Sequence, residues 1–422
     1  EHPAAETSPS PLVDSAVLLA SLTPHTGNAI TADRLANALP ARQLTRCDVN
    51  AFASPADLAP LLARVRADVV VGVHAYRSGR LLLDCGVPYI LVLGGTDMNE
   101  HLHEKRRGGV IRRVVAQASA IVAFDSNLLA KLIAAAPAAE RKAFLVPQAV
   151  SVSPGIPCEE GSTMSGPAER SFIRSQLQLE PGEQLLLLPA GLRPVKDVLY
   201  GVEAIAAWHA HDPRVQLRIV GPRLDATYAA EVESALSTPA LAACARFCGP
   251  LPREHLHAAM RDAALVLNCS TSEGMCNSLL EAMRVGTPVV ARHNGGNAAL
   301  IANGETGLLF SSPDELVAQA KRLLPEHDGE ECSILAARIA GAAECHVANA
   351  HTEEAEAESY AAALRFALNN RGPPPRDRYF LGLHAPAHAP ADQVDVYSTL
   401  ACKTWAAEGS WLTAELVRGR AL

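Results

Sequence analysis

The sequence predicts an α/β protein made of two Rossmann-like domains, each with a parallel sheet, that face a cleft. Three observations predict this class. Short apolar strand patterns alternate with helical segments along most of the 422 residues, and such alternation is typical of parallel strands joined by crossover helices. A Pro-, Gly- and Ser-rich stretch, residues 151–170, separates two such series. Glycine-containing loops follow several strands, at the sheet edge where α/β domains bind ligands.

Composition is that of an ordinary globular protein. Hydrophobic residues make up 49% and charged residues 19% of the chain, and the length suffices for two or three domains. The net charge of −8 argues against nucleic acid as a partner, because neutralising phosphates requires a basic surface. No apolar run approaches the roughly 18 residues of a membrane span, so we expect none.

The ten cysteines are scattered, form no C-x-x-C pair, and in several cases lie inside apolar strand patterns. We expect buried free thiols, and hence an intracellular reducing compartment, either the cytoplasm or an organelle matrix or stroma. The chain begins with Glu1 instead of Met. A cleaved presequence and an incomplete start are both open.

The first domain is predicted over residues 15–150, after a disordered lead-in of residues 1–14 that is rich in Pro, Ser and Ala. Its first strand, Ser15–Leu22, runs through a glycine-containing loop into a helix from about Ala29 to Leu39. By pattern alone this loop is more typical of a plain turn than of a phosphate loop. The further predicted strands are Asp68–Val73, Tyr89–Leu93, Ala120–Phe124 and Phe144–Val146.

Two polar residues follow strands of this domain and are therefore expected at the ligand-binding edge of the sheet, namely His74 and Asp97. A single histidine is more often structural than functional. Segment 100–104 carries acidic residues and two histidines, which suggests a metal site. However, His101 and His103 are two positions apart and would lie on different faces of a helix. We interpret this segment as solvated and polar.

The second domain is predicted over residues 171–370, after the linker 151–170. Residues 371–422 form an extension that begins with three prolines and carries Trp405 and Trp411. We expect it to dock on the body of the protein or on a protein partner. The predicted strands of the second domain are Gln184–Leu188, Val215–Val220, Arg246–Cys248, Ala264–Asn268, Pro288–Ala291 and Gly307–Phe310.

One stretch of the second domain, from Ser272 to Met283, has the pattern of an anion site. Thr271 and Ser272 are good helix N-caps, and Gly274 lets the backbone approach a ligand closely. The first turn of the helix that we expect to follow presents free N–H groups to a phosphate.

Two carboxylates lie eight positions apart in this stretch. Glu281 is expected about two turns along the helix, where it can accept hydrogen bonds from vicinal hydroxyls such as those of a ribose. Glu273 lies at the mouth, where it can contact a second polyol. An ordinary strand–loop–helix with solvated acids is the alternative, and the flanking glycine and strand motifs argue against it.

With these flanking motifs the chain resembles the donor half of family-4 retaining glycosyltransferases, also called glycosyl transferases group 1. The closer resemblance is to the glycosyltransferase 1 domain-containing protein 1 group. It extends from about Ala16 to about Asn369 and implies the GT-B fold. The motifs that carry it are Pro24–Ala29, Gly94–Glu100, Gly191–Asp197, Ser272–Met283, Gly286–Val290 and Gly304–Leu309.

The resemblance implies specific roles for four charged side chains. Arg193 and Lys196 bind the donor diphosphate, whose leaving charge guanidinium and ammonium groups stabilise. Many family members space these two residues farther apart, whereas here they are three apart, as in the closer group. Glu281 binds the ribose of the donor and Glu273 contacts the transferred sugar.

The resemblance also implies contacts through the backbone of the second domain. The amides of Gly274, Met275, Cys276 and Asn277 contact phosphate or sugar. Gly249 lies in the loop that meets the nucleotide base.

In the first domain the resemblance implies that Gly27 and Asn28 bring backbone to the reacting centre. His74 and Asp97 are implied as acceptor or sugar contacts. The helix Glu353–Asn369 would close the fold and pack back toward the first domain.

The implied activity is transfer of a hexose, with retention, from a UDP- or GDP-linked sugar to an acceptor that the sequence does not identify. The leaving phosphate acts as the base, so no protein nucleophile is required. The sequence has no D-x-D motif, so we expect neither a divalent metal nor a cofactor beyond the nucleotide sugar as co-substrate.

The alternative is a catalytically silent GT-B protein that serves as a binding or structural subunit through residues 373–422. A degenerate enzyme should have lost some of Arg193, Lys196, Glu273 and Glu281, and none is lost. The sequence therefore favours the enzyme. A PLP-dependent phosphorylase of the same fold is disfavoured because no cofactor-lysine signature is recognisable.

Overall fold

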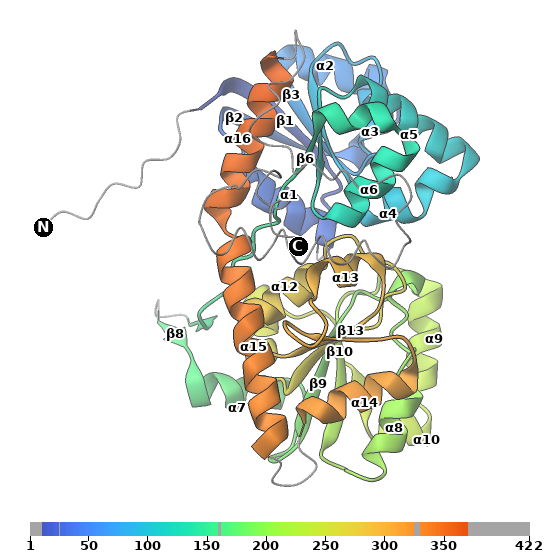
Figure 1. Ribbon diagram of the computed structural model, residues 1–422, viewed down its shortest axis with the longest axis vertical. Coiled ribbons are helices and arrows are strands. Elements are labelled where there is room, and N and C mark those ends of the chain that lie inside the picture. Colours follow the sequence, from blue (N-terminus) through green and yellow to red (C-terminus); the bar gives the residue numbers. More distant parts are fainter. Residues whose placement is uncertain (1–10, 25, 159–161, 325–329, 370–422) are drawn as a thin grey trace, which may run out of the picture. The chain divides into compact units, whose positions relative to one another are not determined.

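The computed structural model describes residues 11–24, 26–158, 162–324 and 330–369 (Figure 1). These residues form two compact units. The first holds the chain up to Ala149 and again from Glu353, and the second holds Val150–Thr352. The predicted extension 371–422 and most of the predicted lead-in lie outside the described residues.

The first unit contains a six-stranded parallel sheet in the order β2-β1-β3-β4-β5-β6. The chain leaves β1 to form β2 on one side and crosses back to form β3 on the other. The carboxyl ends of β1 and β3 are therefore the topological switch point, where such sheets bind ligands. The strands are β1 Val13–Ala20, β2 Ala41–Asp48, β3 Val69–Val73, β4 Tyr89–Val92, β5 Ala120–Ala123 and β6 Ala143–Leu145.

Strand β2 is absent from the sequence-based prediction. It is the edge strand and pairs only with β1, in the register Val13 to Ala41. Most of its side chains are partly or fully exposed, so the segment lacks the continuous apolar pattern that marks the buried strands. Its strand conformation comes from the ladder with β1.

Helices cover the sheet of the first unit, and a helix from the far end of the described chain joins them. Helix α16, Glu353–Asn369, packs against α1, β4 and β5 (Figure 1). The other helical segments are α1 Gly27–Ala38, η1 Val49–Ala51, α2 Pro55–Val65, α3 Gly79–Leu82, α4 Gly95–Asn99, η2 His101–His103, α5 Lys105–Gln117, α6 Ser126–Ala135 and η3 Pro137–Lys142.

The second unit also contains a six-stranded parallel sheet, in the order β11-β10-β9-β12-β13-β14. Here the switch point lies between β9 and β12. Both faces of the sheet are covered, because Leu186 and Leu188 of β9 enter one apolar core while Leu185 and Leu187 enter another. The strands are β9 Gln184–Pro189, β10 Val215–Val220, β11 Ala245–Phe247, β12 Leu265–Asn268, β13 Val289–Arg292 and β14 Leu308–Phe310.

Part of the predicted linker 151–170 has regular structure. It contains the short antiparallel pair of β7, Ile156–Pro157, and β8, Thr163–Met164, and the start of α7, Gly166–Gln176. The remaining helical segments of the unit are η4 Pro194–Lys196, α8 Val202–His209, α9 Ala226–Leu236, α10 Pro239–Ala242, α11 Arg253–Asp262, α12 Asn277–Arg284, α13 Gly295–Leu300, α14 Pro313–Leu323 and α15 Glu330–Ala350.

The predicted strands agree with those observed to within about two residues at each end, so the two parallel-sheet domains expected from the sequence are confirmed. Among the described residues no helix is both long and apolar enough to cross a membrane.

Candidate functional site

The strand order of the second unit brings two loops together at its switch point. One follows β9 and contains η4, and the other follows β12 and leads to α12. The amide of Thr271 in the second loop donates to the carbonyl of Val195 in the first, at 3.0 Å. Residues that are far apart in sequence therefore share this edge of the sheet.

The two loops carry an ion pair formed by two of the predicted site residues. Lys196 Nζ lies 2.5 Å from Oε1 of Glu273, and Asn268 donates to the same oxygen at 3.2 Å. The two charged side chains are only 16% and 10% exposed. Burial raises the pKa of Glu273, but the Lys196 ammonium and the hydrogen bonds outweigh it and hold the pKa below its ordinary value. The pair is thus a preformed anion and cation at the sheet edge.

Two arginines lie at the same edge of the sheet. Arg193 precedes η4, is exposed, and has no ion-pair partner within the described part of the chain. Arg292 at the end of β13 was not predicted as a site residue. It donates to Asp197 Oδ2 at 2.7 Å, and its guanidinium carbon lies 3.6 Å from the ring centroid of Tyr200. Its position at a strand end was the signal that could have identified it.

The helix that carries Glu281 begins later than predicted. Its N-cap is Cys276 and its first residue is Asn277, so the prediction of Thr271 and Ser272 as caps was wrong. Tertiary contacts hold these residues in the preceding loop, since Thr271 bonds to the η4 loop and Cys276 Sγ accepts a hydrogen bond from Asn268 at 3.2 Å. The first turn of α12, with the positive end of the helix dipole, therefore begins at Asn277.

Glu281 lies inside the unit, only 4% exposed. Its Oε1 is 3.3 Å from Arg253 Nη2 and 3.6 Å from His257 Nε2. Neither residue was predicted from the sequence. Both lie on α11, four positions apart and hence on one helix face, directly after the loop that contains Gly249. That spacing was the available signal. Gly249 itself has a φ of +71°, which suits glycine.

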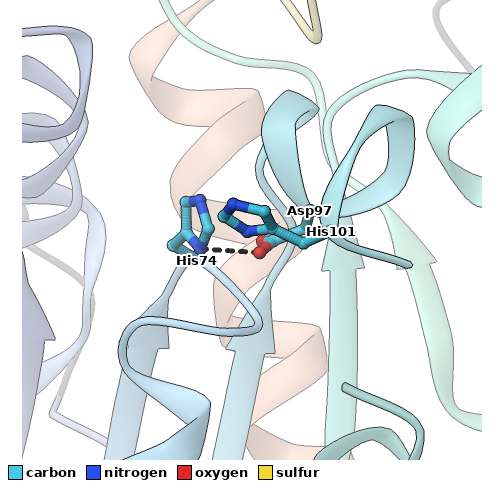
Figure 2. A group of neighbouring side chains, drawn as sticks. All are labelled: His74, Asp97 and His101. Carbon is cyan, nitrogen blue, oxygen red and sulfur yellow. Dashed lines mark ion pairs between the residues drawn. The ribbon is translucent and has the colours of Figure 1, made fainter. Parts of the chain in front are cut away.

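In the first unit, His74 and Asp97 come together at the carboxyl ends of β3 and β4. His74 Nδ1 lies 2.6 Å from Asp97 Oδ1, as Figure 2 shows. Asp97 is fully buried and also accepts hydrogen bonds from three backbone amides, those of Ala75, Tyr76 and Gly94. Burial raises the pKa of Asp97, but His74 and these hydrogen bonds together lower it below its usual range. Nδ1 of His74 also lies 3.3 Å from the amide nitrogen of Arg77, but the carboxylate of Asp97 is much closer, at 2.6 Å. The short contact with a carboxylate places the proton on Nδ1, and Nε2 is not engaged by this carboxylate.

His101 corrects the interpretation of segment 100–104 as solvated. Its side chain is buried, although its neighbours Glu100, His103 and Glu104 are exposed. Its ring lies 5.5 Å from that of His74 (Figure 2), and its Nδ1 has no hydrogen-bond partner among the described residues. Burial, followed by the nearby positive groups, lowers the pKa of His101, which favours a neutral ring at pH 7.

His74, Asp97 and His101 could together hold a metal ion, because their ligand atoms lie within 4.8 Å of one another. The hydrogen bonds of Asp97 weigh against that use. Each of its two oxygens already accepts two hydrogen bonds, so a metal would have to displace one of them. The arrangement fits an oriented histidine better than a metal ligand set.

Gly27 and Asn28 open α1, directly after the loop that follows β1. Gly27 is exposed and Asn28 half-buried, and the cap residue Thr26 accepts from the amide of Ala29 at 3.4 Å. The carboxyl end of β1 is one side of the switch point of this sheet. The two residues therefore lie at the predicted sheet edge of the first unit, as His74 does.

Comparisons with known proteins agree with this layout. The domain described as glycosyl transferases group 1 matches residues 183–326, which include Arg193, Lys196, Glu273 and Glu281. A glycosyltransferase 1 domain-containing protein 1 from Xenopus tropicalis is 32% identical over 347 residues, which cover 82% of this chain and 95% of that protein. A D-inositol 3-phosphate glycosyltransferase from Nocardia farcinica is 32% identical over 225 residues, or 50% of this chain and 47% of that protein.

Solved structures with similar folds are more distant in sequence. A crystal structure of Anabaena Alr3699/HepE in complex with UDP and glucose matches with a TM-score of 0.69 at 18% identity, over 83% of this chain and 99% of that one. A sucrose-phosphate synthase from Thermosynechococcus elongatus matches with a TM-score of 0.66 at 17% identity, over 83% and 98% of the two chains. The predicted fold class, with its two parallel-sheet Rossmann-like domains, is therefore confirmed.

Proposed function

This chain belongs to the glycosyltransferase 1 domain-containing protein 1 family, and from that premise we propose that it transfers a hexosyl residue from a nucleotide sugar to an acceptor. The observation that carries the proposal is the meeting of Lys196 with Glu273 at the switch point of the second sheet. Glu281 lies on the helix that follows, and all three residues fall in the segment that matches the glycosyl transferases group 1 domain. Polyol-binding carboxylates beside fixed cations suit a sugar linked to a diphosphate.

In this proposal each of the four charged site residues of the second unit binds a particular part of the nucleotide sugar. Arg193 and Lys196 bind the diphosphate and stabilise the negative charge that develops as it leaves. Glu273 contacts the transferred sugar, and Glu281 accepts hydrogen bonds from the ribose hydroxyls. Exposure of Arg193 and its lack of a charged partner among the described residues support its availability to a ligand.

Backbone groups complete the donor site in this proposal. The amides of Met275, Cys276 and Asn277, with Gly274 before them, contact phosphate or sugar. The late start of α12 supports this role, because the positive end of the helix dipole then lies at these residues. Gly249 lies in the loop that borders the base.

The first unit supplies the acceptor side. Gly27 and Asn28 bring backbone to the reacting centre, and His74 contacts the sugar or the acceptor through Nε2. Asp97 acts on His74 by fixing its ring. The hydrogen bond between His74 Nδ1 and Asp97 supports this assignment.

We further propose that the reaction retains the anomeric configuration, as in family-4 enzymes. In that route the sugar–phosphate bond breaks, and the acceptor hydroxyl attacks from the same face and gives its proton to the leaving phosphate. No protein nucleophile takes part. Arg193 and Lys196 supply the fixed positive charge for the leaving diphosphate, so we expect activity without a divalent metal or further cofactor.

A thermal-shift panel tests the proposal. UDP, GDP and ADP and their common sugar conjugates are added to the full chain, with and without EDTA. A ligand at a hundred times its Kd stabilises the folded state by about 2.7 kcal/mol. UDP is the first arm, because the Anabaena structure was solved with UDP and glucose. Glu281→Gln and Arg193→Ala are run beside Glu203→Gln, an exposed control on α8.

The expected result is a shift with one nucleotide class that is unaffected by EDTA, is retained in the control, and is much smaller in the two site variants. Absence of a shift with every nucleotide would contradict the proposal and favour the catalytically silent protein. A shift abolished by EDTA would contradict metal independence alone. Product analysis by NMR with the ligand so identified then tests retention.

A further inference from the structure

We propose that His257 is a positioning residue for the donor site, which holds the carboxylate of Glu281 in place for the ribose of a nucleoside diphosphate. The inference rests on the proposed function, because it assigns a partner to the carboxylate that this function places on the ribose. It is carried by two observations on the same imidazole ring, one at each nitrogen.

The first observation fixes the tautomer of the ring. The backbone amide of Ser153 lies 2.9 Å from Nδ1 of His257 and donates to it. An amide N–H can only donate, so Nδ1 must be the unprotonated acceptor. The proton of the neutral ring is therefore on Nε2. A main-chain group some hundred positions away thus determines which nitrogen presents a hydrogen.

The second observation concerns the other nitrogen. His257 is fully buried, and Nε2 has no hydrogen-bond partner among the described residues. Its nearest acidic group is Oε1 of Glu281, at 3.6 Å. That distance is too long for a hydrogen bond, and a buried donor without a partner is costly. A shift of under 1 Å by the Glu281 side chain would complete the bond, and such shortening on ligand binding is common in functional sites.

Both contacts of Glu281 fall on one oxygen. Arg253 Nη2 donates to Oε1 at 3.3 Å and His257 Nε2 lies 3.6 Å from it. Arg253 is the more exposed of the two, with 45% of its side chain accessible. We infer that His257 holds Oε1 while Oε2 receives the ribose hydroxyls. A carboxylate restrained at one oxygen binds a diol at a lower entropic cost than a free one.

The segment that orients the His257 ring, residues 151–153, is fixed by side chains of helix α11. Arg261, on the same helix, donates to the carbonyl of Ser153 at 2.7 Å and pairs with the buried Glu169 of α7. Arg253 donates to the carbonyl of Ser151 at 2.8 Å. These bonds tie segment 151–153 to α11, so the amide that orients His257 is itself fixed. The start of the second unit therefore takes part in ordering the donor site.

Two substitutions of His257 by an amide side chain distinguish the contribution of Nδ1 from that of Nε2. In His257→Asn the side-chain oxygen can replace Nδ1 as acceptor for Ser153, but no group reaches Glu281. In His257→Gln the longer side chain carries its N–H to the place of Nε2 and loses the bond to Ser153. The two variants are similar in polarity. They differ in which contact of His257 they keep, the one with Ser153 or the one with Glu281. Each is measured with Glu281 intact and in the Glu281→Gln background.

The measurement is the Kd of the full chain for UDP, with GDP in parallel, by calorimetry at neutral pH. We expect His257→Asn to weaken binding about tenfold, as for loss of a bond to a charged group, and His257→Gln to stay within about threefold of the parent. In the Glu281→Gln background the effect of His257→Asn should disappear, because the two residues act through one contact. Equal losses in both single variants, or an undiminished effect in that background, would overturn the inference.

A second readout does not depend on ligand affinity. Nitrogen NMR of the imidazole in the full chain reports which nitrogen carries the proton, and we expect protonated Nε2 and unprotonated Nδ1. The opposite tautomer would overturn the inference even if the variants bound weakly. A parent chain that binds neither UDP nor GDP would refute the proposed function, and with it this inference. Tight binding by the parent and by His257→Asn alike would refute the inference alone.

Discussion

Lys196 and Glu273 are 77 positions apart in sequence, and their charged groups lie 2.5 Å apart. The contact arises because β9 and β12 are neighbours in the sheet, although two strands, β10 and β11, lie between them in the chain. Each loop supplies one charge at the switch point. A buried pair of this kind depends strongly on both partners, because removing one leaves the other unpaired.

Replacing Lys196 with Met should therefore destabilise the protein in a pH-dependent way. In the parent the pKa of Glu273 is lowered, so its contribution is present above the unfolded pKa of about 4.3 and is lost as the pH falls through the folded value. Without Lys196, burial dominates and raises the pKa, so ionisation of Glu273 costs stability as the pH rises. We expect a loss of about 3 kcal/mol at pH 7 and a clearly smaller one at pH 4.5, measured by urea unfolding.

The control for that experiment is Lys196→Met combined with Glu273→Gln. The amide carries no charge, so the double variant should recover most of the loss at pH 7 and show little pH dependence between 4.5 and 7. A loss of equal size at both pH values would mean that packing, and not the charge of Glu273, explains the effect.

Gly296→Ala should disturb the loop that carries Glu273. A Cβ at position 296 would lie 2.1 Å from the carbonyl oxygen of Gly274 and 2.5 Å from that of Glu273, and backbone atoms cannot give way as a flexible side chain can. We expect a lower Tm and loss of nucleotide binding. Gly341→Ala on α15 is the matched control, because no atom lies within 4 Å of its added Cβ. It should be neutral or stabilise by up to about 1 kcal/mol. Unchanged binding in Gly296→Ala would contradict the prediction.

His74 should tolerate Asn better than Ala. Its φ is +78°, a conformation that Asn adopts more readily than Ala, and an Asn amide can still donate to Asp97. We expect His74→Asn to unfold within about 1 kcal/mol of the parent and His74→Ala to lose about 2 kcal/mol, the cost of a hydrogen bond to a buried carboxylate. Both variants lack Nε2 and should lose the extra affinity for a nucleotide sugar over the bare nucleotide. Equal stability of the two, by urea unfolding, would refute the role of the Asp97 bond.

Arg34 and Glu356 form a buried ion pair in the first unit, with Arg34 Nε 2.8 Å from Glu356 and the side chains 12% and 1% exposed. Burial raises the pKa of Glu356 and the Arg34 charge opposes it. Arg34→Met should cost about 3–5 kcal/mol in the unfolding of this unit, and adding Glu356→Leu should restore most of it. Urea unfolding at pH 7 measures both. A double variant no more stable than the single one would show that α1 and α16 need this pair for their packing.

Much of the fold could be predicted from the sequence, because buried parallel strands are continuous apolar runs. Val69–Val73 and Tyr89–Val92 are marked by their own residues whatever surrounds them. The half-exposed β2 has no such run, and its conformation depends on the neighbouring strand β1. The motif of Glu273 and Glu281 was likewise visible as spacing, since loops at strand ends keep short local patterns.

The tertiary structure decided which groups meet and where local elements begin. Thr271 and Ser272 have the intrinsic preference of N-caps, but Thr271 bonds to the η4 loop instead and α12 begins only at Asn277. His101 is buried by packing that its polar neighbours do not signal. Arg253 and His257 reach Glu281 only because α11 and α12 pack together. Local propensity and apolar periodicity are properties of a few consecutive residues, so the sequence shows them directly. Charge pairing, burial and the tautomer of a histidine depend on which strands and helices become neighbours, so only the folded chain determines these three properties.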